Sequence, residues 1–355
     1  MFKLTTNLCC LLISAALAER ANVCVTLARW HLCHIVRKIY KNTLARELKK
    51  DACIPMAKSK GVSASGVPHH VLTSCEDVFV QPLGKERAVD ARKQYLCEEL
   101  LPEGYLHSDH LLWAQAVKQF ENLIVQSGTS RANSWAYDNF ISSSTIRMVQ
   151  QTKQQLAELL HKAGFLSSSV YWADHCNRYA NSPEILQAVL CAGLYPRVAH
   201  SLVRGTGGPS KPGHRLRLCT KHWKRVEIHP KSVNCKKTAF ATRYLCYYQA
   251  VKSTGINLYD CSMVSPLSLV VLSGHLEHGR QEEGTLLLDE WIKFYSTSST
   301  ANLLDRVRRQ LVVSLEERVD RPRPLLWTGD SDLETDFFEA LCQLLLNEPL
   351  RFWSG

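Results

Sequence analysis

The chain has 355 residues, of which 45% are hydrophobic and 21% are charged, a composition typical of a soluble globular protein with two or three domains. Its formal charge of +10 favours an anionic partner but does not show that this partner is a nucleic acid. The 14 cysteines form no Cys-x-x-Cys pair, which excludes the usual zinc-ribbon and thioredoxin motifs. We therefore expect reduced cysteines, no bound metal and an intracellular protein.

Residues 1–70 carry the fewest structural signals and are left without a domain. An apolar run at 8–17 follows Lys3, but it is too short to span a bilayer, and we interpret it as a buried helix rather than a secretion signal. Residues 56–70 are rich in Gly, Ser and Pro and are expected to form a linker. The cytoplasm is the predicted location, with the nucleus or mitochondrion as alternatives, and no association with a membrane is expected.

Residues 71–202 are predicted to form a helical domain. Ser108 precedes a helix, and one of the serines at 142–144 begins a later one. The first helix carries an apolar face of Leu111, Leu112, Val117 and Phe120. Between these two we expect a helix that holds Trp135, Tyr137 and Phe140. Ser182 and Pro183 have the residue types that begin another helix, which Pro196 ends.

Residues 203–300 are predicted to form a small β-barrel that follows a basic, glycine-rich loop. The runs 244–251 and 256–259 are rich in Tyr, Val, Ile and Leu, and the turn between them contains Gly255, which is typical of a hairpin. A third apolar run at 267–272 and more apolar residues at 284–295 extend this pattern of short strands. Ser265, just before Pro266, is expected to bind backbone groups of a turn.

Residues 301–355 are predicted to form helices that pack on the barrel. The segment 301–319 is amphipathic, and Ser331 with Glu334 has the spacing of a capping box that opens the last helix. From Ser314 onward the chain is acidic. Between residues 197 and 254, in contrast, lysines and arginines are frequent and Glu227 is the single acid. The positive charge is therefore concentrated in the predicted barrel and the loop that leads into it.

The turn between the two strand-like runs is the strongest candidate site. Lys252, Ser253 and Thr254 offer a charge and two hydroxyls to phosphates, and a neighbouring tyrosine offers a ring to a base. Alternation along the strand directs one of Tyr247 and Tyr248 into the core, and Tyr248 is our candidate for the exposed ring. The alternative is a solvated turn beside core tyrosines. Electrostatic support, or simply a solvated basic face, is expected from Lys231, Lys236, Lys237 and Arg243.

Several motifs occur in an order that is specific as a set. They are FVQPLGKERAVDARK (79–93), SDHLLWAQAVKQFE (108–121), NFISSSTIRMVQQTKQQLAELLHKAGF (139–165), LQAVLCAGLYPRVA (186–199), IHPKSVN (228–234) and YYQAVKSTGINLYDCSMVSPLSL (247–269). In these motifs the chain resembles the C-terminal region of DEAH/RHA-type RNA helicases. The resemblance implies an α+β fold, in which a helicase-associated, ratchet-like helical domain precedes an oligonucleotide-binding (OB) barrel and C-terminal helices.

The resemblance also implies sites. The turn at 252–254 would line an RNA exit channel, and Asn139, Ser142 and Arg147 could face the RNA. From the sequence alone, helix capping by Asn139 or Ser142 is the alternative. The histidines His107 and His110 have no third ligand at a suitable spacing and are interpreted as surface residues. The set of candidate RNA-binding residues is thus Lys252, Ser253, Thr254, Tyr248, Lys231, Lys236, Lys237, Arg243, Asn139 and Arg147.

The 355 residues lack the motifs of the helicase motor: no Gly-x-x-x-x-Gly-Lys phosphate loop, no Asp-Glu-x-His box and no arginine-finger run. We predict no catalytic residue and no cofactor in this chain, since ATP and Mg²⁺ are implied only for a full-length helicase. The expected function is to guide single-stranded RNA as an accessory region. The alternatives are a fragment of an active ATP-dependent RNA helicase, or a platform without a motor that binds a helicase activator or a ribonucleoprotein component.

Overall fold

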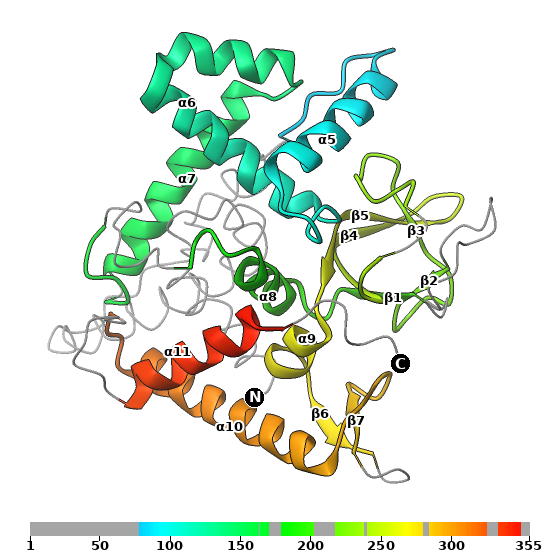
Figure 1. The fold of residues 1–355 in the computed structure, drawn as a ribbon, viewed down its shortest axis with the longest axis vertical. Helices are drawn as coiled ribbons and strands as arrows, with labels where there is room; N and C mark the ends of the chain where they lie inside the picture. Colours follow the sequence, from blue (N-terminus) through cyan, green and yellow to red (C-terminus); the bar gives the residue numbers. More distant parts are fainter. Residues whose placement is uncertain are drawn as a thin grey trace, which may run out of the picture.

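A computed structural model describes residues 78–348 of the chain, except for 163, 170–178, 202–216, 238–239, 280–283 and 325–332. The predictions for residues 1–70 and for the glycine-rich loop at 203–213 lie outside these residues. Helices α5 to α7 form one side of the molecule, the larger sheet lies beside α5, and α10 and α11 lie at the opposite end (Figure 1). No helix in the described ranges is long and apolar enough to cross a membrane.

The helical part begins with α5 (Glu86–Leu100), α6 (Asp109–Asp138) and α7 (Ser143–Lys162). Two of the predicted helix starts are confirmed by their caps: the hydroxyl of Ser108 accepts a hydrogen bond from the N–H of Leu111 (3.1 Å), and that of Ser142 accepts one from Thr145 (3.1 Å). The predicted apolar face of the first helix is buried throughout, at Leu111, Leu112, Val117 and Phe120.

Helix α6 is kinked at Gly128, where φ is 82° and ψ is 169°. The second helix that we predicted is the limb of α6 after this kink, and it contains Trp135 and Tyr137. Phe140 lies beyond its end with a φ of 55°, so its assignment to the helix was wrong. A glycine permits this kink because other residues rarely adopt such backbone angles.

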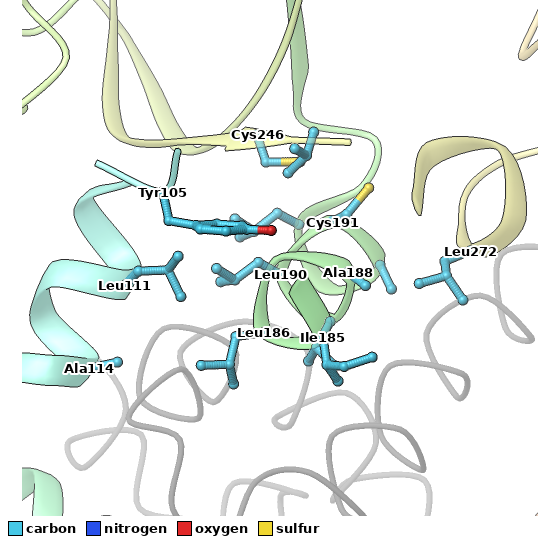
Figure 2. Close-up of a cluster of buried hydrophobic side chains, with 14 of the residues drawn as sticks. Tyr105, Leu111, Ala114, Ile185, Leu186, Ala188, Leu190, Cys191, Cys246 and Leu272 are labelled. Atoms are coloured by element: carbon cyan, nitrogen blue, oxygen red, sulfur yellow. The ribbon is translucent and has the colours of Figure 1, made fainter. Parts of the chain in front are cut away.

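Helix α8 (Pro183–Leu194) is the centre of the core. Every residue from 185 to 194 is buried, as expected for a helix that is apolar on all sides. Its side chains lie between Leu111 of α6, Cys246 of β4 and Leu272 of α9 (Figure 2). The predicted helix start at Pro183 is confirmed, and the helix ends before Pro196 as expected.

The larger sheet contains β1 (Val198–Ser201), β2 (Leu218–Cys219), β3 (Glu227–Ile228), β4 (Tyr244–Lys252) and β5 (Ile256–Val264), in the order β2-β1-β4-β5-β3. A bridge between Leu218 and Val226 joins its two edge strands. The ring order is therefore 1-2-3-5-4-1, with β3 parallel to β5 and the other neighbours antiparallel. This is a nearly closed five-stranded barrel of the OB type, so the predicted fold class and hairpin are confirmed.

Two assignments to the barrel were wrong. The apolar run at 267–272 forms a helix, α9 (Pro266–Leu272), because Ser265 caps it by accepting a hydrogen bond from Ser268 N–H (3.0 Å) and Pro266 occupies its first turn. Residues 284–295 belong to a separate three-stranded sheet, which is formed by β6 (Leu276–His278), β7 (Thr285–Leu288) and β8 (Ile292–Tyr295). The barrel itself begins at Val198, ahead of the domain boundary predicted at 203.

The chain continues with α10 (Ser298–Asp320) and α11 (Leu333–Leu346), at the positions predicted for the C-terminal helices. Helix α10 packs against α9 and β7, and α11 packs against α8, so the main contacts of these helices are not with the barrel strands on which we had predicted them to pack. Ser331 of the predicted capping box lies outside the described residues. Its partner Glu334 binds the guanidinium groups of Arg318 and Arg323, and thereby links α11 to the end of α10.

His110 is not a surface residue, as we had expected, since its side chain is only 1% exposed. Its Nδ1 lies 2.6 Å from the hydroxyl of Ser262, and its ring lies in an edge-to-face arrangement with that of Trp113, with centroids 5.6 Å apart. Burial lowers the pKa of His110 from 6.5 to about 3. The imidazole therefore stays neutral in the folded protein, whereas the unfolded chain takes up a proton near its ordinary pKa.

This difference in pKa predicts a loss of stability in weak acid. Below the unfolded pKa of 6.5 the unfolded state binds one proton more at His110 than the folded state, so the free energy of unfolding falls as the pH is lowered towards 3. We expect His110 to make the protein about 2 kcal/mol less stable at pH 5 than at pH 7. Urea unfolding of wild type and His110→Gln at both pH values checks this. An equally steep loss in both proteins would contradict it.

Candidate nucleic-acid interface

The turn at 252–255 joins β4 to β5 and is exposed along its whole length. Lys252 pairs with Ile256 at the end of the ladder, and the N–H of Ser253 donates to the carbonyl of Gly255 (2.8 Å). The Asn257 amide donates to the Ser253 hydroxyl (3.3 Å). The turn is thus ordered by its own hydrogen bonds while the side chains of Lys252 and Thr254 remain in solvent. In OB folds the loop between strands 4 and 5 is one of the segments that bind oligonucleotides.

A second basic segment, residues 231–237, follows β3 and is fixed by the carboxylate of Asp109 at the start of α6. This carboxylate accepts hydrogen bonds from the Ser232 hydroxyl (2.6 Å), the Val233 N–H (2.8 Å) and the Cys261 N–H (2.8 Å). From α5, Lys93 donates to the carbonyl of Lys231 (3.2 Å). The segment is therefore held between α5, α6 and β5 by hydrogen bonds with the side chains of Lys93 and Asp109, which mostly involve its backbone.

The lysines of this segment project from a fixed backbone. Lys231 and Lys236 are exposed and Lys237 is half-buried. Lys236 lies 3.5 Å from the carboxylate of Asp90, but its side chain is 78% exposed, and such surface pairs are worth little. An anionic ligand could replace Asp90 at a small energetic cost. The structure therefore keeps all three predicted lysines at or near the surface.

Tyr248 and Arg243 are less accessible than predicted for direct contacts. Tyr247 lies in the barrel interior, as alternation requires, whereas Tyr248 is half-buried against the core around α8. Arg243 is half-buried and directly precedes Tyr244. Tyr244 is the first residue of β4 and pairs with Val264. Lys252 lies at the opposite end of the same strand. The fold therefore does not bring Arg243 and the turn together.

The two candidates from the helical part have contacts of their own. Asn139 is 1% exposed and is the C-cap residue of α6; its Oδ1 accepts from Arg92 Nε (2.7 Å) and its Nδ2 donates to the Trp135 carbonyl (2.6 Å). The amide is thus used inside the fold, in agreement with the capping alternative. Arg147 is exposed on α7 and donates to Asn133 Oδ1 (3.2 Å). Of these two, Arg147 keeps an accessible charge.

Two aromatic groups on the barrel were not among the predicted residues. His229 stacks on Tyr259, with ring centroids 3.9 Å apart and an angle of 20° between the planes. Trp223 lies in the exposed turn at 221–225, which joins β2 to β3. The sequence signal for Trp223 was available, because Lys-His-Trp-Lys-Arg places an aromatic residue between cations within one short turn.

Residues 186–276 match the family described as oligonucleotide/oligosaccharide-binding (OB)-fold. The chain is 34% identical to the ATP-dependent DNA/RNA helicase DHX36 of Bos taurus, over 79% of this chain and 28% of that protein, and 33% identical to human DHX36 over the same shares. It is 30% identical to the DExH-box ATP-dependent RNA helicase DExH1 of Arabidopsis thaliana, over 69% of this chain and 23% of that protein.

The chain thus spans about a quarter of the length of these relatives. The part of the chain that matches them includes the helices α5 to α8 and the barrel, in the order predicted from the motifs. The OB-type strand order and the OB-fold match agree with each other. In sequence and in fold, the chain is similar to a C-terminal region of DEAH-type RNA helicases, with an OB-fold domain at residues 186–276.

Proposed function

We propose that the chain is an RNA-binding accessory region of a DEAH/RHA-type helicase that guides single-stranded RNA. The observation that carries this proposal is the ordered, fully exposed turn at 252–255, at the place where OB folds bind oligonucleotides. Its ammonium and hydroxyl groups suit phosphate oxygens, which carry no sequence information. Binding would therefore show little sequence preference and a strong dependence on salt.

The basic segment at 231–237 supports the same proposal. Asp109 and Lys93 bind the backbone that carries its exposed lysines, so little backbone entropy would be lost when these lysines meet a polyanion. Unwinding coupled to ATP hydrolysis would require motor domains in addition to the helices and the barrel of this chain. In a complete enzyme this region would steer a strand that the motor domains move.

The proposal predicts that Lys252→Glu weakens the binding of single-stranded RNA by about tenfold at low salt, because one phosphate contact is replaced by a repulsion. The slope of log K against log salt should become smaller by about 1. Fluorescence anisotropy with a labelled RNA of about twelve nucleotides, over a series of salt concentrations, measures both quantities.

Lys293→Glu is the matched control, since Lys293 is exposed on β8 of the separate sheet and the change in charge is the same. We expect this variant to lose much less affinity than Lys252→Glu. Equal losses would show that only the net charge matters and would contradict a site at the turn. Absence of RNA binding by the wild-type chain at low salt would favour the protein-interaction platform instead.

A further inference from the structure

The turn at 221–225 presents a tryptophan to solvent. Trp113, Trp135 and Trp291 pack against the main core, whereas Trp223 is 37% exposed. The other four residues of the turn are exposed as well, and three of them are the cations Lys221, Lys224 and Arg225. Since more than a third of Trp223 remains in water, a ligand that covers the exposed part of the ring would gain binding energy.

The backbone of this turn is ordered before any ligand binds. The N–H of Trp223 donates to the Thr220 hydroxyl (3.1 Å), and the N–H of Thr220 donates to the Trp223 carbonyl (2.9 Å). Below the turn, the N–H of Val226 donates to the Leu218 carbonyl (2.9 Å). The rings of His222 and Trp223 are in an edge-to-face arrangement, with centroids 6.2 Å apart and an angle of 74° between the planes. The indole is therefore held on a closed hairpin rather than on a loose loop.

The strand register places this turn at the same end of the barrel as the turn at 252–255. Glu227 of β3 lies beside Asn257 at the start of β5, and the two strands are parallel. Residues 221–225 precede β3, just as 252–255 precede β5. Both turns therefore open at one end of the barrel, where a single strand can contact Lys252 and Trp223.

The cations beside the indole can meet phosphates. The ammonium group of Lys221 donates to the carbonyl of Asp289 (2.9 Å), which fixes one side of the turn. Arg225 lies 3.3 Å from Glu227, but both side chains are well exposed, at 80% and 48%. This pair contributes little and leaves the guanidinium group open to a competing anion. Lys224 is exposed directly beside Trp223.

We propose that the turn at 221–225 is a base-stacking subsite for single-stranded nucleic acid. A base stacks on the indole of Trp223 while Lys224 and Arg225 bind the flanking phosphates. The inference rests on the proposed function, and it adds that this chain holds bases as well as the backbone of the strand. Stacking accepts every base, because each one has a π face.

The test compares two labelled ligands of equal charge: an RNA of about twelve nucleotides and an oligomer with the same number of phosphates but no bases. The full chain should bind the RNA more tightly than the abasic oligomer. Trp223→Ala should weaken RNA binding about five- to tenfold and leave the affinity for the abasic oligomer unchanged. Trp223→Phe should restore most of the loss, since phenylalanine keeps an aromatic face.

Tyr295→Ala is the control, because Tyr295 is 66% exposed on β8 of the other sheet, and it should change neither affinity. Unchanged RNA binding by Trp223→Ala would overturn the inference while the proposed function stands. Equal losses on both ligands would also overturn it, since they would show a role in holding the cations. If wild type binds neither ligand, the proposed function and the subsite both fail.

Discussion

Replacing Asp109 with asparagine is expected to lower the free energy of unfolding by about 3 kcal/mol. The side chain is 4% exposed, and its two oxygens accept three hydrogen bonds, from Ser232, Val233 and Cys261. An asparagine has a single acceptor oxygen, so its NH₂ group would face one or two of these donors. At least one buried N–H would then lose its partner.

The position of Asp109 explains why the loss should be large. It is the first residue of α6, where the positive end of the helix favours a carboxylate. Burial raises the pKa of Asp109 above its ordinary value, and the three donated hydrogen bonds oppose this rise because they stabilise the charged form. The same carboxylate connects the helical part, the segment 231–237 and β5. Its loss therefore weakens three parts of the structure together.

Urea unfolding of the full chain measures the expected loss, and Asp305→Asn is the control. Asp305 pairs with Arg309 one turn away on α10. Because the Arg309 side chain is 72% exposed, the loss of this pair should change the free energy of unfolding by less than about 0.5 kcal/mol. Hydrogen exchange gives a local measurement, because the amides of Val233 and Cys261 should exchange faster in Asp109→Asn. Unchanged exchange at both amides would show that the carboxylate does not hold the segment.

Local chemistry allowed much of the fold to be predicted. The starts of α6 and α7 depend on serine caps, and each cap lies within a few residues of the first apolar positions of its helix. The β4–β5 hairpin depends on the alternation of residues on both sides of a glycine-containing turn. The run at 267–272 could not be assigned in this way. A short apolar run fits a strand or a buried helix, and the Ser265–Pro266 start decides for the helix.

The assignment of residues 284–295 to the barrel failed for a different reason. Which strands pair is decided by contacts between segments distant in sequence, and the sequence of β7 fits either sheet. The candidate site likewise contains residues whose environment follows from the local sequence and residues whose environment depends on distant contacts. Lysines in a turn can be predicted to be exposed, as for Lys252. The burial of Asn139 and the role of Asp109 depend on residues 47 and more than a hundred positions away.

Gly284, which immediately precedes β7, is expected to tolerate no side chain. Its φ is 78°, and a Cβ at this position would lie 1.9 Å from the carbonyl oxygen of Ser296. That oxygen belongs to the backbone, and the N–H of Ser296 donates to the carbonyl of Gly284 (2.9 Å), so the two segments cannot separate without loss of this hydrogen bond. We expect Gly284→Ala to lower the free energy of unfolding by about 3 kcal/mol or more, from backbone strain and displacement together.

Gly255→Ala separates this effect from the general cost of replacing a glycine. A Cβ at Gly255 would meet no neighbouring group within 4 Å, and the φ of this residue is not positive, so alanine there should change stability by less than about 1 kcal/mol. Urea unfolding compares both variants with wild type, and hydrogen exchange of residues 284–296 shows whether the β7–β8 hairpin opens. If both glycines tolerate alanine equally, the approach of Ser296 does not constrain the hairpin. If only Gly284→Ala unfolds early, the close approach of the Ser296 carbonyl to Gly284 constrains the hairpin as expected.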